Sequence, residues 1–236
     1  MQGMRIQQVQ LSSTTKFQNT GCSNLHKDLP TCALDPPPRR ASEDYFVNFM
    51  VLLKKEMTLF YTGKGDKGKS SIGGKKYPKD SPIVEALGDL DELNSLIGVV
   101  KTQAHKPSLI KKLEKVQESL FIIQARIAWI MYPKFPSPQM TEEKIKVMEQ
   151  EIDVIEKKIK PARGFVVSGS DPVASWLDML RAVSRRAERR VVKLHKTNAL
   201  PQEIIAYLNR LSSYLYALAR AEAAAKKTKE LHPTYK

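Results

Sequence analysis

Apolar residues recur at spacings of three and four along most of the chain from residue 80 onward. This spacing places them on one face of an α-helix, whereas a half-buried strand alternates with a period of two. Because the loops between the periodic segments are short, we predict an all-α fold, a five-helix antiparallel bundle. Each segment starts at a proline or at a helix-capping residue: Ser81-Pro82, Pro107, Thr141, Ser170-Asp171-Pro172 and Pro201.

The composition agrees with a folded, basic protein. Hydrophobic residues make up 42% of the 236 residues, which is enough for a sizeable core. The formal net charge of +14 favours anionic partners such as nucleotides, nucleic acid or acidic lipid. No apolar run approaches the roughly 20 residues that span a bilayer, so we expect no membrane partner. Cys22 and Cys32 both lie near the N-terminus, so we expect neither a disulfide nor a cysteine metal site in the bundle.

The first 56 residues differ from the rest of the chain. They are rich in Gln, Ser, Thr and Asn and show no long periodic pattern. We interpret residues 1–56 as a disordered leader, or as an artefact if Met57 is the true start, and residues 57–236 as the bundle domain. The first 27 residues contain Arg5 and Lys16 but no acid, so a targeting segment is the alternative. We therefore expect a cytoplasmic protein, or one of an organellar matrix if the leader is a transit peptide.

A glycine- and lysine-rich segment precedes the first predicted helix. The residues from Gly63 to Ser70 fit the P-loop pattern, in which backbone N–H groups of a glycine-rich turn surround phosphates. A P-loop must open a helix, however, and the stretch from Ile72 to Pro78 contains two glycines and ends in proline, so it cannot begin one. We therefore reject a P-loop fold but retain a phosphate-binding loop. The alternative is a mobile, lysine-rich surface loop.

The predicted fourth helix carries a dense arginine stretch from Arg181 to Val192. At about 100° per residue, one face of this helix collects Arg181, Arg185, Glu188 and Arg189, whereas Arg186 and Arg190 point elsewhere. Three guanidiniums on one face repel each other unless an anion meets them, so the face is either an anion site or a solvated basic surface. The predicted fifth helix has a polar side made of Asn209, Ser213, Tyr216 and Arg220.

Four segments in this order resemble the PduO-type ATP:cob(I)alamin adenosyltransferases, over about residues 57–230. They are the loop from Tyr61 to Ser71, Pro78-Lys79-Asp80, the stretch from Gly88 to Asn94, and Arg181 to Val192 together with Leu208 to Tyr214. The resemblance implies transfer of the 5′-deoxyadenosyl group of ATP, with Mg²⁺, to the Co(I) of cob(I)alamin, which releases tripolyphosphate. It also implies a homotrimer with active sites between subunits, and an adenosylcobalamin-dependent enzyme as a possible recipient of the product.

The same resemblance assigns roles to individual residues. Arg185 and Arg189 are implied to be catalytic, Asp91 to pair with Arg185, and Phe165 to displace the lower ligand of cobalt. The residues implied to bind ATP are Thr62, Gly63, Lys64, Gly65, Asp66, Lys67, Gly68, Lys69, Ser70, Ser71, Lys79, Arg185, Arg186, Ala187, Glu188, Arg189 and Asn209. This agrees with the chemistry of the residues, because arginine forks suit phosphate oxygens and Co(I) is itself a nucleophile.

The sequence departs from the family at several places, including Lys69, a position that is usually not lysine. From Thr62 to Asp66 the loop has the sequence Thr-Gly-Lys-Gly-Asp, where the family usually has Thr-Lys-Thr-Gly-Asp. From Val166 to Ser170 the chain has Val-Val-Ser-Gly-Ser, where the family usually has Ile-Leu-Pro-Gly-Gly. Ser213 stands where the family usually has an aspartate, which leaves one partner fewer for the arginines. Two functions are alternatives to the adenosyltransferase: nucleic-acid binding by a basic helical protein, and the binding and transfer of cobalamin and ATP by a carrier without catalysis.

Overall fold

The computed structural model describes residues 60–61, 63–72, 74–133, 136–159, 161 and 164–235. The chain divides into two compact units, Met1–Met57 and Thr58–Lys236, and every described residue belongs to the second. The interpretations of residues 1–56, and the loop residue Thr62, lie outside the described residues.

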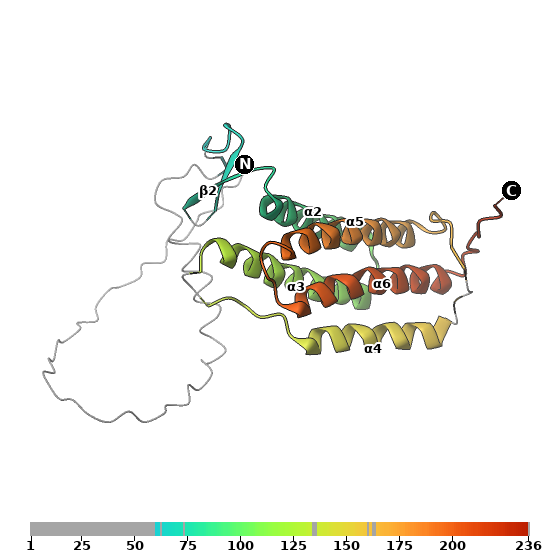
Figure 1. Ribbon diagram of the computed structural model, residues 1–236. Helices are drawn as coiled ribbons and strands as arrows, with labels where there is room; N and C mark the ends of the chain where they lie inside the picture. Colours follow the sequence, from blue (N-terminus) through green and yellow to red (C-terminus); the bar gives the residue numbers. More distant parts are fainter. Residues whose placement is uncertain are drawn as a thin grey trace, which may run out of the picture. The chain divides into compact units, whose positions relative to one another are not determined.

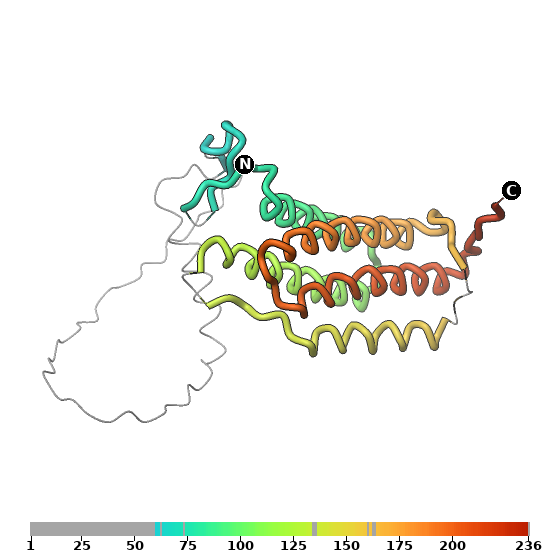
Figure 2. Tube along the Cα trace, viewed as in Figure 1, coloured from blue at the N-terminus to red at the C-terminus, as the bar shows by residue number. Residues whose placement is uncertain are grey.

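The described part of the chain contains five long helices besides a short hairpin, which confirms the predicted all-α fold class (Figure 1). Successive helices run in opposite directions (Figure 2). α5 packs against α2 and α6, α3 packs against α2, and α4 packs against α6. The helices are α2 (Pro82–Gln103), α3 (Pro107–Met131), α4 (Glu142–Ile159), α5 (Pro172–His195) and α6 (Gln202–Ala225).

The starts of the helices follow the capping signals, with one exception. Asp171 caps α5, because its Oδ1 accepts hydrogen bonds from the backbone N–H groups of Val173 and Ala174 at 3.0 and 3.1 Å. Ser81 was predicted to cap α2, and this is wrong for its side chain, whose buried Oγ has no partner among the described residues. The helix nevertheless begins there because Pro82 has a helical φ and the Ser81 carbonyl accepts from Glu85 N at 3.0 Å.

The predicted apolar stripes form the core of the bundle. Trp176 is an exception: its spacing of four from Leu180 predicts a place in the apolar stripe of α5, but it is 38% exposed. In the same turns of α5 the neighbouring positions Val173, Ala174 and Leu177 are buried instead, so the buried face there is offset from Trp176. Members of the stripes that are almost completely buried include Leu90, Leu93, Ile97, Leu113, Leu120, Ile123, Leu180, Ala187, Val191, Leu208, Leu211 and Leu215.

A half-buried carboxylate attaches α4 to the bundle. Glu151 accepts hydrogen bonds from Lys112 of α3 and from the Tyr214 hydroxyl of α6. Burial by itself raises the pKa of Glu151, but these two donors outweigh it and hold the pKa below its ordinary value of 4.5. Burial, together with the neighbouring Glu151, raises the pKa of Tyr214. The side chains of these three residues therefore join three helices.

The glycine-rich segment leads into a β-hairpin instead of a helix. Strands β1 (Lys69–Ile72) and β2 (Lys75–Pro78) pair in an antiparallel arrangement, with Ser70 opposite Tyr77. This confirms that the segment is not a P-loop, since residues 69–72 form a strand. The hairpin is attached to the bundle through Ile72 and Tyr77, which pack against the core.

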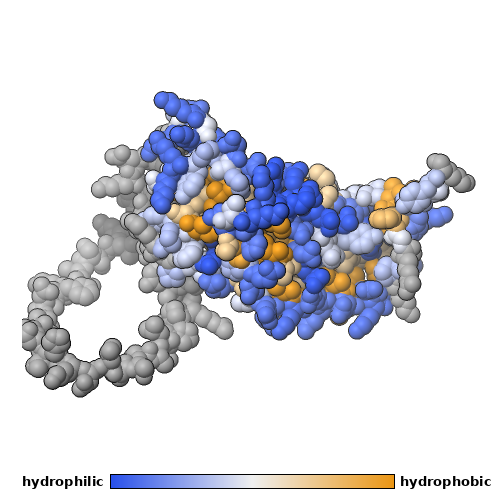
Figure 3. All heavy atoms as spheres, viewed as in Figure 1, coloured by the Kyte–Doolittle hydropathy of each residue, from blue (hydrophilic) through white to orange (hydrophobic). Residues whose placement is uncertain are grey.

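The viewed face of the molecule is mostly hydrophilic, with apolar atoms between the helices and beside the C-terminal tail (Figure 3). The exposed large hydrophobic residues of that tail and of the loop before α5 are Phe165, Val167, Leu231 and Tyr235. Among the helices that the structure describes, none combines the length and the apolar character needed to cross a membrane.

Candidate functional site

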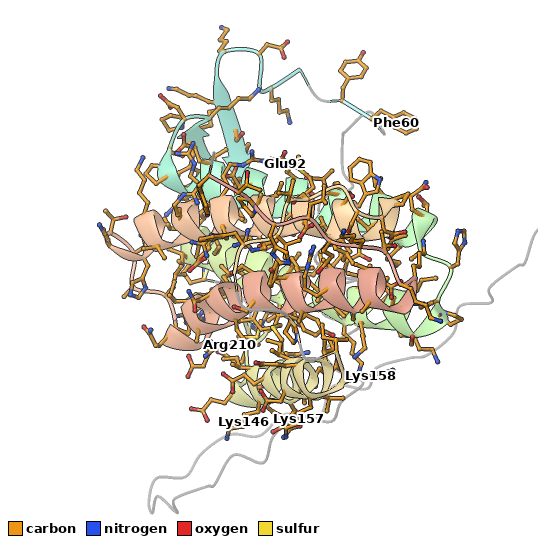
Figure 4. All side chains as sticks on the ribbon, turned by 90° about the vertical axis from the view of Figure 1, so that its right-hand side faces the viewer. Phe60, Glu92, Lys146, Lys157, Lys158 and Arg210 are labelled. Carbon is orange, nitrogen blue, oxygen red and sulfur yellow. The ribbon has the colours of Figure 1, made fainter. Side chains whose placement is uncertain are left out.

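The arginines of α5 fall into two groups with different partners. Arg190 donates to Glu85 Oε2 at 3.1 Å, and Arg186 donates to Glu92. Asp89 lies between them, with its Oδ2 at 3.5 Å from Arg190 Nε and 4.0 Å from Arg186 Nε. The acids lie four and three residues apart on α2, and therefore form a row that faces the arginine row of α5. Figure 4 shows Glu92 on one side of the bundle and α4, with Lys157 and Lys158, on the opposite side.

Arg185 and Arg189 lie on another face of α5 and are exposed. In the described residues, neither has an acid within ion-pair distance. They are four residues apart, so their guanidiniums project side by side from adjacent turns. Two neighbouring cations without acids repel each other and attract a multivalent anion. Arginine forks can bind phosphate oxygens in a bidentate manner, so this pair fits a polyphosphate.

Glu188 and Asn209 are brought together beside this arginine pair. Asn209 Nδ2 on α6 donates to Glu188 Oε1 on α5 at 3.0 Å. About two turns before Glu188 on α5, the Arg181 guanidinium lies over the Tyr216 ring, 5.4 Å from its centroid. Ser213 is exposed, and no hydroxyl contact joins it to the arginines. The α5–α6 contact therefore places the predicted polar residues of both helices on one surface.

Two residues that the resemblance assigns to ATP have other surroundings within the chain. The side chain of Arg186 is engaged by Glu92, and that of Ala187 is fully buried in the core. Ala187 consequently has no side-chain surface for a ligand. The acid row of α2 was not recognised in the sequence. The pattern that could have revealed this row is the spacing of Glu85, Asp89 and Glu92 by four and three residues. Arg186 and Arg190 are likewise four residues apart.

The predicted pairing of Asp91 with Arg185 is not formed within the described chain. Asp91 is exposed, and no ion pair joins it to Arg185. The reason is its position on α2: Asp91 lies about 200° around the helix from Asp89, which faces α5. A single chain therefore leaves both the acid and the arginine without the expected partner.

The glycine-rich loop and Lys79 lie together. Lys79 N donates to the Gly68 carbonyl at 2.9 Å, and Gly68 N donates to the Gly65 carbonyl at 3.1 Å. The Lys79 side chain crosses the loop so closely that a Cβ at Gly65 would lie 3.4 Å from Lys79 Nζ. Gly63 and Gly68 have positive φ values of 63° and 70°, which other residues rarely adopt. The loop thus places a lysine ammonium next to turns of exposed backbone.

Phe165 lies far from this loop within one chain. Its side chain is 75% exposed, and it precedes α5, whereas the hairpin precedes α2. Because α2 and α5 run in opposite directions, the two features lie at opposite ends of the bundle (Figure 1). The 22 residues of α2 span about 33 Å at 1.5 Å per residue. The structure therefore does not bring Phe165 to the hairpin of the same chain.

The described residues contain no group of three or more His, Cys, Asp or Glu side chains that could hold a metal ion. Glu188 is the acid closest in sequence to the arginine pair, and it is already hydrogen-bonded to Asn209. These donors do not form a metal site of their own, so a divalent cation at this surface would have to be bound mainly by the ligand.

Comparison with known proteins places these features in a family. A family model described as cobalamin adenosyltransferase matches residues 60–222. The corrinoid adenosyltransferase of Bacillus subtilis (strain 168) is 37% identical over 164 residues, which cover 68% of this chain and 84% of the relative. The corrinoid adenosyltransferase PduO of Citrobacter freundii is 37% identical over 166 residues; these cover 69% of this chain but only 49% of that longer protein.

A solved structure shows the same fold. It is a phenylalanine-to-alanine variant of the PduO-type ATP:corrinoid adenosyltransferase from Lactobacillus reuteri, complexed with cobalamin and ATP. Its TM-score is 0.70 at 30% sequence identity, and the match covers 74% of this chain and 98% of that one. Because the family model spans more than half of the sequence and the relatives align with over two thirds of it, the chain belongs to the cobalamin adenosyltransferase family.

Proposed function

We propose that this protein transfers the 5′-deoxyadenosyl group of ATP to the Co(I) of reduced cobalamin, giving adenosylcobalamin and tripolyphosphate. The observation that carries the proposal is the pair Arg185 and Arg189, two exposed guanidiniums without an acid in the described residues. The names of the relatives and the cobalamin and ATP bound to the structural neighbour support the substrates.

The reaction needs leaving-group stabilisation more than proton transfer. Cobalt(I) donates an electron pair to the ribose C5′, the C5′–O bond breaks, and the electrons of that bond pass to the tripolyphosphate oxygen. Cobalt is thereby oxidised to cobalt(III). Since the nucleophile carries no proton, no general base is required. We assign to Arg185 and Arg189 the task of binding the charge that develops on the leaving group.

We further assign the triphosphate to the lysine-rich loop, residues 62–71, and to Lys79. The backbone N–H groups of its turns and the Lys79 ammonium can surround phosphate oxygens. Glu188 and Asn209, joined by their hydrogen bond, are proposed to contact the nucleotide beside the arginines. Mg²⁺ would neutralise part of the triphosphate charge and arrive as MgATP.

We also propose a homotrimer in which each site is formed between subunits. Two observations support it: Asp91 and Arg185 do not pair within one chain, and Phe165 lies at the opposite end of the bundle from the hairpin. A neighbouring subunit could bring its own Asp91 to Arg185, and could bring Phe165 to the cobalamin held at the other chain's loop. We also propose that an adenosylcobalamin-dependent enzyme receives the product.

The domain assignment also remains a proposal. We place catalysis in residues 57–236 and regard residues 1–56 as a leader, with the cytoplasm as the compartment, or an organellar matrix if the leader is a transit peptide. Nucleic-acid binding is less well supported, because Arg186 and Arg190 are already paired with α2 acids and are thus less available to phosphates.

The product assay tests the activity directly. Purified protein is incubated anaerobically with MgATP and cobalamin reduced to the Co(I) state, and the products are separated. We expect adenosylcobalamin and tripolyphosphate in equal amounts. Release of phosphate or diphosphate instead would refute this reaction class, and binding of both substrates without turnover would identify a carrier.

A further inference from the structure

Arg220 of α6 is a buried cation that the proposed reaction does not use. It is only 4% exposed, although the sequence pattern places it on the polar side of its helix. Its Nη2 donates to Asp178 Oδ2 at 2.6 Å, and its Nη1 donates to Glu230. Its guanidinium also lies over the Tyr216 ring, 4.9 Å from the centroid. A buried guanidinium is costly unless acids neutralise it, so this cluster holds its members in a defined geometry.

Glu230 belongs to the C-terminal tail that follows α6. The next two residues of the tail contact the loop before α5: Val167 N donates to the Leu231 carbonyl at 2.8 Å, and His232 Nδ1 donates to the Phe165 carbonyl at 2.8 Å. The Arg220–Glu230 ion pair is therefore the anchor immediately before the two hydrogen bonds that hold this loop.

Apolar burial does little to hold the described part of this loop, whose far end is tied to α6 by the Lys226–Asp171 ion pair at 2.7 Å. The side chain of Phe165 is 75% exposed and that of Val167 is 45% exposed, so apolar burial contributes little to their positions. Gly164 and Gly169 have positive φ values of 126° and 115°, which shows that the loop backbone bends at both ends of the Phe165–Val167 segment. The contact of the Phe165 backbone that the structure describes is therefore with the tail, and Arg220 is the anchor of the tail nearest to that contact.

We propose that Arg220 is a positioning residue for the corrinoid: through Glu230 and the tail, it fixes the loop that presents Phe165 to the cobalamin. Asp178 supplies the second acid and ties the cluster to α5. This inference rests on the proposed function, because it assigns to Phe165 the corrinoid side of that site.

The test separates the tail anchor from the stability of the bundle. Glu230→Gln removes the negative charge that pairs with Arg220 but leaves the Arg220–Asp178 pair. Lys229→Gln changes the adjacent exposed residue and serves as the control. We expect Glu230→Gln to lower kcat/KM for cob(I)alamin by about tenfold, the scale of one lost charge-assisted hydrogen bond. The melting temperature should fall, because the buried Arg220 loses one of its two acids, whereas the KM for ATP should stay unchanged and Lys229→Gln should resemble the wild type.

A double-mutant cycle then tests whether Glu230 acts through the loop. If it does, Glu230→Gln should add almost nothing to the loss caused by Phe165→Ala. Additive losses, equal losses for ATP and cob(I)alamin, or wild-type kinetics of Glu230→Gln would each overturn the proposal. Lack of turnover in the wild type would instead refute the proposed function.

Discussion

Replacing Arg185 by Met separates the proposed catalytic role of the arginine pair from any structural role. Methionine keeps much of the aliphatic length of the side chain but removes the charge and the donors. In the described residues Arg185 has no acid to lose, so the substitution breaks no ion pair within the chain. It also relieves repulsion from Arg189 one turn later. The free energy of unfolding of the chain should therefore change by no more than about 0.5 kcal/mol.

The expected loss of turnover is much larger. Removing one donor that stabilises charge developing in the transition state costs about 2–4 kcal/mol. That range corresponds to a decrease in kcat of roughly 30- to 1000-fold. The loss should appear in kcat as well as in kcat/KM, because the leaving group gains charge only as the C5′–O bond breaks.

The assay compares this variant with Arg210→Met, the same change at another partly exposed arginine. Arg210 Nε lies 2.8 Å from Glu149 Oε1, and Figure 4 shows Arg210 on the side of the bundle where α4 lies. Losing this surface pair should cost at most about 1 kcal/mol of stability and leave turnover unchanged. The rate of adenosylcobalamin formation and the thermal midpoint are measured for both. Parallel losses of turnover and stability in Arg185→Met would show that our reasoning about the site is wrong.

Three further predictions concern the interface, the loop and the bundle. Asp91→Asn and Arg185→Met chains, each nearly inactive alone, should regain activity when refolded together, because a mixed trimer contains interfaces with both native residues; no recovery would contradict a shared site. Lys79→Ala should raise the KM for ATP but not that for cob(I)alamin, as steady-state kinetics can show. The pKa of Glu151 is lowered in the folded chain, so its contribution to stability is present above about pH 4.5 and lost as the pH falls. Glu151→Gln should therefore flatten the decrease of the melting temperature below that pH, and an unchanged acid slope would contradict this assignment.

The helices could be predicted because their signals are local. Proline at the start and apolar residues at spacings of three and four act within a few turns, so the five segments were recognised without knowing their neighbours. Glycine and proline likewise excluded a helix after the glycine-rich loop, but the strand Lys69–Ile72 was not predicted. Trp176 and the Ser81 hydroxyl were assigned wrongly because which helix face is covered and which polar atom finds a partner depend on the packing of neighbouring elements.

The sequence by itself determined that α5 carries arginines on more than one face, but it did not determine which of them are neutralised. That depends on the tertiary structure, because only the packing of α2 against α5 brings Glu85 and Glu92 to Arg190 and Arg186. Packing likewise turned Arg220 from a polar surface residue into a buried anchor, because Asp178 and Glu230 come from α5 and from the tail. Helical periodicity fixes the direction of a side chain, whereas its charge partner is fixed by whichever helix packs against that face.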